Sequence, residues 1–193
     1  MSICLTYEKE FLTKCKNGKP GISEVWLANY TDLNTVTLDT AGEIIESITV
    51  DTYGAALTTP PYTSGAFFRI LTNRESSTAS NEAIIDVPNG TSINKPMVSF
   101  KISGMDKTVA AAFKQLMEAP VVAIIKTVDG NFWLAGKDNG LDMESGSMLS
   151  FGTTSTDFAG AEINLSGLEA DPILPINHEP VAGFDVYDVL VAV

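Results

Sequence analysis

Few side chains of this sequence have the type and spacing that catalysis or metal binding requires. The chain has one histidine, His178, and two cysteines, Cys4 and Cys15. A structural zinc ion needs four ligands, and a cysteine nucleophile needs a neighbouring base, for which His178 is the only good candidate. His178 lies between Pro175 and Pro180, in a stretch that reads as extended. We therefore expect no catalytic residue, no metal and no cofactor, and two cysteines that remain thiols.

A group of carboxylates around residue 140 has a second chemical interpretation. Asp138, Asp142 and Glu144 could be calcium ligands, but their spacing does not fit the EF-hand loop, which needs acids at its first, third and fifth positions and a glutamate at its twelfth. The sequence also lacks a phosphate-binding glycine loop and a nucleophile elbow. An enzyme is therefore the least favoured class of protein.

The negative charge is concentrated at one end of the chain. The net charge is −12, and after Lys137 the sequence contains ten acids and no bases. Nucleic-acid binding needs Lys and Arg to displace counterions from phosphate, so this charge excludes a conventional DNA-binding protein. Two interpretations stay open: the acids only keep the protein soluble, or their concentration at one end of the chain has a functional role.

Length and composition predict one folded domain. The 193 residues suffice for a substantial core, and 45% hydrophobic against 19% charged residues argues against disorder. No apolar run is long enough to cross a bilayer, and the N-terminus lacks the basic and apolar regions of a secretory signal. We expect a protein that stays in the cytoplasm where it is made and has no membrane partner.

A period of two dominates the sequence and predicts a mainly β fold. Strands are expected in three early stretches, 22–27, 35–38 and 44–50, which are rich in β-branched and aromatic residues. Residues 66–72 and 82–87 are predicted to pair as a long hairpin whose tip is the polar stretch between them. Such a hairpin can dock on a neighbour, although a solvated loop is the commoner outcome.

Only one segment has the period of a helix. An apolar stripe runs from Val109 to Leu116 at helical spacing, Asp106 can cap its start, and Pro120 bars its continuation. We expect this helix over about residues 106–119. A single amphipathic helix among many strands must cover a sheet edge or close the end of a β-sandwich.

Further strands are predicted on both sides of this helix. Alternation indicates one over residues 97–103 and a last long one over 157–167. Residues 121–128, 131–136 and 141–143 are typical of a three-stranded meander. An Asp-Gly and an Asn-Gly pair at its two reversals supply the positive φ angles that tight turns require.

Two motifs resemble those of a known family. The segment from Asn131 to Leu141, NFWLAGKDNGL, is similar to the "YWLLGKDNGLE" segment of a family of tail-associated virion proteins in phages of Bacteroidetes hosts, including crAss-like phages. Cys4 and Cys15, followed by GISEVWLAN at residues 21–29, resemble that family's opening cysteines and its "GGIKEIYLAN" strand. The helix and the strands after it fall in the same order.

The resemblance covers about residues 1–168 and departs from the family in two places. Lys19-Pro20-Gly21 replaces a double glycine, and residues 169–193 have no counterpart. The resemblance implies a β-sandwich or barrel of the tail-tube type with one flanking helix over residues 1–168, and an extended C-terminal arm over 169–193. The arm is therefore a feature in which this chain differs from the family.

The resemblance also implies a structural role in a phage tail. Such subunits join their sheets into homo-oligomeric rings, here expected to be a hexamer or a dodecamer, around a channel for genome or protein ejection. Other tail or portal-proximal virion proteins are the expected partners, and DNA passes only as a cargo that does not stick. The expected location is the virion tail, after assembly in the host cytoplasm.

Two sets of residues become candidates under this interpretation. Acids that would face the lumen or the surface are Asp138, Asp142, Glu144, Asp157 and Glu162. The apolar C-terminal end is expected to pair with an edge strand, either of its own sandwich or of an adjacent subunit. The candidate contacts between subunits are Phe184, Val186, Val189 and Val191.

A carbohydrate-binding or adhesin module is the alternative, because it would also be a β-sandwich. Trp26, Trp133, Tyr53 and Tyr62 would serve as sugar platforms if they were exposed. Both tryptophans lie mid-strand among aliphatic residues, where burial is favoured. The structural virion protein therefore remains the preferred interpretation.

Overall fold

The computed structural model describes residues 21–50, 67–72, 76–86, 88–154, 157–176 and 186–188. Some residues singled out from the sequence lie outside these ranges, namely Cys4, Cys15, Tyr53, Tyr62, His178, Phe184, Val189 and Val191.

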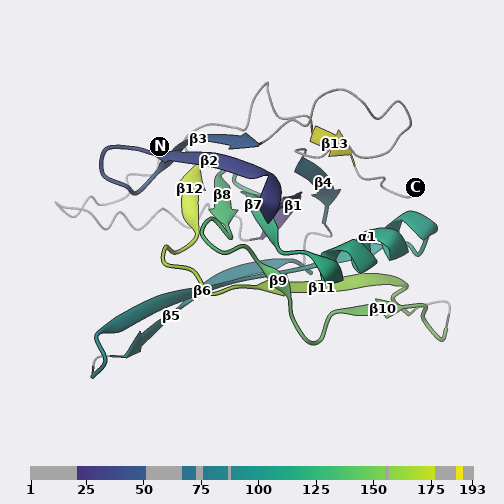
Figure 1. The fold of residues 1–193 in the computed structure, drawn as a ribbon. Helices are drawn as coiled ribbons and strands as arrows, with labels where there is room; N and C mark the ends of the chain where they lie inside the picture. Colours follow the sequence, from purple (N-terminus) through teal and green to yellow (C-terminus); the bar gives the residue numbers. More distant parts are fainter. Residues whose placement is uncertain are drawn as a thin grey trace, which may run out of the picture.

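Two β-sheets form the layers of the fold (Figure 1). The larger has eight strands in the order β13-β4-β1-β7-β8-β12-β3-β2, and the smaller has five, in the order β10-β11-β6-β5 with β9 beside β11. The mainly β fold with one α-helix in the described residues is thereby confirmed.

The larger sheet contains β1 (Ile22–Asn29), β2 (Leu33–Leu38), β3 (Ile45–Val50), β4 (Phe67–Leu71), β7 (Val121–Thr127), β8 (Phe132–Ala135), β12 (Leu174–Ile176) and β13 (Val186–Asp188). The smaller sheet contains β5 (Thr78–Asp86), β6 (Thr91–Ser103), β9 (Asp142–Met143), β10 (Met148–Ser150) and β11 (Gly160–Ser166). A 3₁₀ turn, η1 (Tyr30–Asp32), joins β1 to β2.

The central strands of the larger sheet are buried on both faces. In β1, Val25 and Leu27 pack into the core between the two sheets, whereas Trp26 and Ala28 pack into a second core on the other face. The neighbouring β7 divides its residues between the same two cores. Because alternate residues enter different apolar environments, these strands read as continuous apolar runs in the sequence.

The helix forms where the sequence predicts it. The α1 helix spans Lys107–Glu118, and the Asp106 carboxylate accepts a hydrogen bond of 2.8 Å from the Val109 amide, which satisfies one of the free donors of the first turn. Val109 is buried in the core between the sheets, with Leu116 packed against it. The helix therefore covers the end of the sandwich beside β9 and β11 (Figure 1).

The predicted hairpin between residues 66–72 and 82–87 is wrong. The β4 strand pairs with β1 in the larger sheet, whereas β5 pairs with β6 in the smaller one. Residues 78–81, predicted as a polar tip, are part of β5. Residues 82–86 lie in a strand as predicted, but no apolar alternation marks residues 78–81 because neither face of β5 is buried there, so only backbone pairing identifies them as strand.

The third strand of the predicted meander, residues 141–143, does not pair with the second strand as predicted. β7 and β8 pair as expected, and Gly130 has a φ of 85° at their reversal. After β8 the chain crosses to the other layer, where β9 pairs with β11 and not with β8. The residue between, Leu141, forms an isolated bridge to Val121. Residues 137–140 are therefore a crossover and not a hairpin turn.

Residues assigned to the C-terminal arm contribute strands to the body. The β12 strand lies between β8 and β3, with Leu174 opposite Leu134 and Ile176 opposite both Phe132 and Ile45. The buried Leu174 side chain belongs to the second core. Proline at position 175 had indicated irregular extended chain, yet this short strand fits between its two neighbours.

The α1 helix has twelve residues and an amphipathic composition. No helix in the described part of the chain has the length and apolar character needed to span a membrane.

Candidate assembly surfaces

The end of the β5–β6 hairpin exposes three isoleucines. Ile84 and Ile93 are cross-strand partners, so they share one face of the hairpin, whereas Ile85 points to the opposite face. Their exposed fractions are 45% for Ile84, 40% for Ile93 and 67% for Ile85. The hairpin projects away from the rest of the smaller sheet (Figure 1). Grouped exposed aliphatic side chains of this kind are typical of an interaction surface.

A short turn holds this hairpin end in shape. The Asp86 carboxylate accepts hydrogen bonds from the Asn89 amide at 3.4 Å and from its side-chain nitrogen at 2.6 Å. Gly90 has a φ of 65°, a conformation that glycine adopts without strain. The register then runs without a shift from the pair Asp86 and Thr91 to the pair Thr78 and Ser99. The ladder fixes the projecting end relative to the body.

Among the residues that the structure describes, no strand pairs with the outer side of β5, which leaves a long open edge. The β5 strand is the last strand of the smaller sheet, and its residues are exposed along the strand except for the half-buried Asp86. An edge strand presents a row of backbone N–H and C=O groups that can pair with another strand. Proteins usually shorten, bend or charge such an edge, whereas β5 has nine residues and only two ionisable ones, Glu82 and Asp86.

A cleft opens between the two sheets under the beginning of β5. Its floor is apolar and consists of Ile22, Ile125, Trp133 and Ile173, while residues 77–81 form its polar rim. The cleft has a volume of about 790 Å³. None of the lining residues that the structure describes carries a charge.

Three of the five candidate acids lie next to a lysine from the first part of the chain. Glu144 pairs with Lys95 at 2.9 Å and Glu162 pairs with Lys101 at 2.9 Å. Lys137 contacts Asp138 at 3.5 Å and also pairs with Asp171. Folding therefore brings bases from before residue 138 onto the acids that follow it, which the charge count along the sequence does not reveal.

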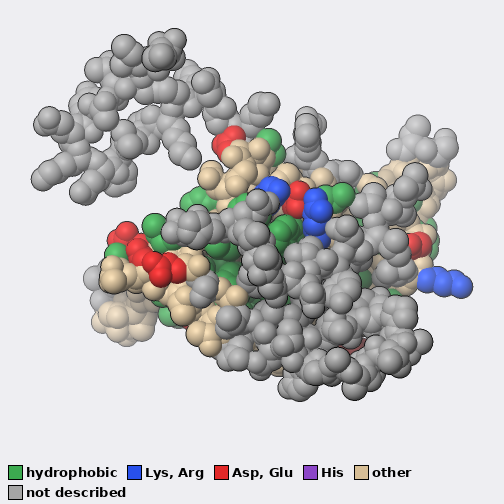
Figure 2. Space-filling view, turned by 90° about the horizontal axis from the view of Figure 1, so that it is seen from above, with side chains coloured by type: hydrophobic (Ala, Val, Ile, Leu, Met, Phe, Trp, Pro, Cys, Tyr) green, Lys and Arg blue, Asp and Glu red, His purple; other side chains and the backbone are tan. Residues whose placement is uncertain are grey.

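The other two candidate acids have different surroundings. Asp142 is exposed on β9. Asp157 is exposed too, and its carboxylate accepts hydrogen bonds from the Thr153 and Thr154 amides at 2.9 and 2.7 Å. These amides hold the pKa of Asp157 below its ordinary value. Figure 2 shows acidic and basic side chains next to one another on the face seen from above, so the charges there are mixed.

A buried carboxylate that sequence reasoning missed joins the two layers. Glu169 is only 3% exposed, and it accepts hydrogen bonds from the Asp138 and Asn139 amides at 2.6 and 3.0 Å. Its own backbone exchanges two hydrogen bonds with Asn94 of β6, at 2.9 and 2.8 Å. Backbone amides of the KDNG segment at residues 137–140 thus bind a carboxylate that lies thirty residues away in the sequence. The spacing of the sequence gives no signal of this contact.

Burial determines how Glu169 titrates. Removal from water raises the pKa of its carboxyl group, the backbone amides of Asp138, Asn139 and Gly140 oppose that rise, and the nearby Asp138 carboxylate adds to it. The pKa lies above its ordinary value because these donors are neutral and do not fully replace water.

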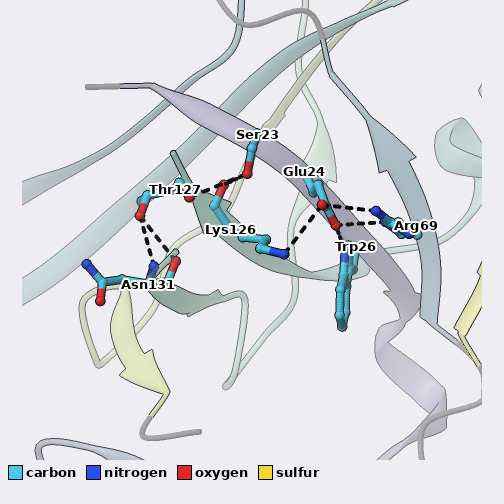
Figure 3. A network of polar contacts seen from close by, with 7 residues as sticks. All are labelled: Ser23, Glu24, Trp26, Arg69, Lys126, Thr127 and Asn131. Carbon is cyan, nitrogen blue, oxygen red and sulfur yellow. Dashed lines mark hydrogen bonds and ion pairs between the residues drawn. The ribbon is translucent and has the colours of Figure 1, made fainter. Parts of the chain in front are cut away.

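A second buried carboxylate lies in the larger sheet and has cationic partners (Figure 3). Glu24 accepts two hydrogen bonds from Arg69, at 2.7 and 3.0 Å, and one of 3.1 Å from the Trp26 indole nitrogen. Lys126 lies 3.5 Å away. Burial raises the pKa of Glu24, but the hydrogen bonds and charges of these partners outweigh burial and lower it.

Of the candidate contacts between subunits, only Val186 lies in the described residues. It begins β13, which pairs in parallel with β4 of the same chain, with Val186 opposite Phe67. The backbone of this C-terminal stretch therefore pairs within its own chain, at one end of the larger sheet.

In the part of the chain that the structure describes, no three His, Cys, Asp or Glu side chains lie together as metal ligands would. The chain matches no family model, no curated protein and no solved structure. The described residues form three candidate surfaces: an open edge strand, a projecting apolar hairpin end and a cleft whose described lining carries no charge.

Proposed function

We propose that this protein is a structural subunit of a phage tail, which assembles with copies of itself into rings around a channel. The observation that carries the proposal is the edge strand β5, whose nine residues are almost all exposed and whose outer side no strand of the described chain covers. Pairing this edge with a neighbouring subunit would bury its backbone groups. Identical subunits joined through two different surfaces close into a ring when the rotation at each step allows it.

Two further features support this role. The resemblance of residues 131–141 and 21–29 to tail-associated virion proteins is the reason for placing the rings in a tail, where other tail or portal-proximal proteins would be neighbours. The net charge of −12 suits a channel wall that polyanions pass without sticking. Asp142 and Asp157 are the best candidates for such a wall, because the three other candidate acids have lysine neighbours.

The alternative as a carbohydrate-binding module is less well supported. Trp26 is 6% exposed, donates its indole N–H to Glu24 and packs edge-on against Phe132, so its ring is not a platform for a sugar. Trp133 is half-buried in the floor of the cleft.

Native mass spectrometry of the purified full-length chain tests self-assembly. We expect one closed stoichiometry, a hexamer or a dodecamer. An Ala83→Lys variant should remain monomeric, because a lysine on an exposed edge strand opposes the pairing of that edge. Gln115→Lys adds the same charge to an exposed site on α1 and should assemble normally. A wild-type chain that stays monomeric at high concentration would contradict the proposal.

The channel wall is tested separately on assembled rings. Wild-type rings should not retain DNA at low salt, whereas rings of an Asp142→Lys and Asp157→Lys double variant should retain it, with a strong dependence on salt. Glu118→Lys reverses one charge on the exposed face of α1 and should leave the rings without retained DNA. Equal DNA retention by both variants would show that these two acids do not line the channel.

A further inference from the structure

The hairpin end and the cleft are complementary in chemistry. Residues 84–93 contain a single ionisable side chain, Asp86, and its carboxylate is hydrogen-bonded to Asn89 in the turn. The described residues that line the cleft carry no charge, and its floor is apolar. Among these residues the contact would bring in one charge, that of Asp86, and its carboxylate would keep the hydrogen bonds from Asn89, which lower the cost of removing it from water.

The hairpin cannot fill the cleft of its own chain. The cleft is rimmed by residues 77–81 at the beginning of β5, and the exposed isoleucines lie at the other end of the same strand. The unbroken ladder with β6 holds β5 extended. A strand in such a ladder does not fold back on itself, so the hairpin end can reach an equivalent cleft only on another molecule.

We propose that the end of the β5–β6 hairpin, with Ile84, Ile85 and Ile93, inserts into the cleft between the two sheets of a second copy of this chain. This inference rests on the proposed self-assembly and specifies its contact. The two surfaces differ, so the contact is heterologous: each copy donates one hairpin and receives one, and the chain of contacts closes as a ring or extends to the next ring.

The location of the cleft also connects this contact to the open edge. The rim of the cleft is the first part of β5, the strand whose outer edge is open. A hairpin entering the cleft would lie beside that edge, with its apolar side chains over Ile125 and Trp133. A few side chains that fill a water-free pocket near the centre of an interface commonly provide most of its affinity.

Disulfide trapping tests the geometry of the contact directly. In a background in which Cys4 and Cys15 are replaced by serine, one population carries Ile85→Cys and a second carries Ala79→Cys in the cleft rim. Mild oxidation of the mixture should give a mixed disulfide dimer in high yield. As a control, Ile85→Cys mixed with Gln115→Cys, whose site is on exposed α1, should give little dimer. Equal yields in the two mixtures would overturn the proposal.

Affinity provides the second readout. Ile85→Ser, which removes the most exposed of the three isoleucines, and Ala79→Trp, which fills the cleft rim, should each weaken self-association by about tenfold or more. Met117→Ser removes a side chain of similar exposure, 65%, from α1 and should not change the association.

The outcomes separate this inference from the proposed function. If Ile85→Ser and Ala79→Trp both form rings like the wild type and no selective disulfide appears, the rings exist but the hairpin does not occupy the cleft, or the cleft receives a different protein. The inference then fails while the proposed function stands. If the wild type does not self-associate, both fail.

Discussion

The two halves of β6 belong to one strand but lie in different surroundings. From residue 96 onward one face is buried in the core between the sheets, and Phe100 has no exposed surface. Before residue 96 the strand runs out into the projecting hairpin, where Ile93 is 40% exposed. The pairing with β5 continues from the outer half into the inner half, as far as Ser99. The difference shows that backbone pairing extends beyond the region that apolar burial stabilises, which leaves the outer half available for contacts with other molecules.

The largest expected effect is a difference in the free energy of unfolding between substitutions in the two halves of β6. Phe100→Ala should lower the free energy of unfolding by about 3–5 kcal/mol, because it leaves a cavity in a filled core. Ile93→Ala should change it by no more than about 0.5 kcal/mol, because the side chain is already partly in water. Urea denaturation at a concentration where both variants are monomeric provides the comparison. Similar losses in the two variants would mean that the hairpin end is packed within its own chain.

Glu169 lies beside Asn94, near the point where the two halves of β6 meet. Its substitution should have the next largest effect on the free energy of unfolding. The backbone of Glu169 holds Asn94, and its carboxylate holds the amides of Asp138 and Asn139. Glu169→Ala leaves these two amides without their acceptor and should cost about 1–3 kcal/mol. Glu169→Gln keeps one carbonyl acceptor and should cost less.

Hydrogen exchange locates the effect of this substitution. The Asn94 amide should exchange faster in Glu169→Ala, while amides in the middle of β7 keep their relative protection. If the Asn94 amide stays as protected as in the wild type, Glu169 does not hold the base of the hairpin.

The sequence predicts the inner half of β6 and misses the outer half for one physical reason. Alternation indicated a strand over residues 97–103, where one face is buried, but β6 begins at Thr91. Residues 91–95 carry no alternation because both faces are exposed or half-buried there, and Pro96, although buried, reads as a break in the sequence. The same absence of burial led residues 78–81, the first part of β5, to be predicted as part of a tip. Apolar periodicity in the sequence indicates which residues are buried. It indicates strand pairing only where a paired strand also has a buried face.

The candidate site was predictable to a smaller extent than the fold. The Asp106 cap and the stripe of α1 depend on residues close in sequence, and the sequence predicts them correctly. The partners of the acids depend on register: Glu162 faces Lys101 because β11 and β6 pair there. The wrapping of Glu169 by residues 137–140 likewise depends on a crossover between layers. Such contacts follow from the tertiary fold and have no local pattern.

The pH dependence of stability should distinguish the two buried carboxylates. The pKa of Glu24 is lowered in the folded protein, so its contribution is present above the ordinary glutamate value and is lost as the pH falls through the lowered pKa. The pKa of Glu169 is raised, so its contribution is full below the ordinary value and is lost as the pH rises through the raised pKa.

Urea midpoints measured across the acid range test both signs. Glu24→Gln should make the loss of stability toward low pH shallower, and Glu169→Gln should flatten the loss between the ordinary glutamate pKa and neutral pH. Each variant is the control for the other, because each should alter only one side of the curve. A change on the same side in both variants would contradict the assignment of opposite shifts.

The smallest expected effect concerns the polar face of the inner half of β6. Lys101 pairs with Glu162 at 2.9 Å, but both side chains are about a third exposed, at 35% and 29%. A double-mutant cycle with Lys101→Met and Glu162→Gln should give a coupling energy below about 1 kcal/mol, which decreases further as salt is added. A coupling comparable to the loss in Phe100→Ala would mean that surface charge stabilises the inner half. A small coupling energy would instead mean that the buried face alone stabilises the inner half of β6. The projecting half of the strand has no such buried face.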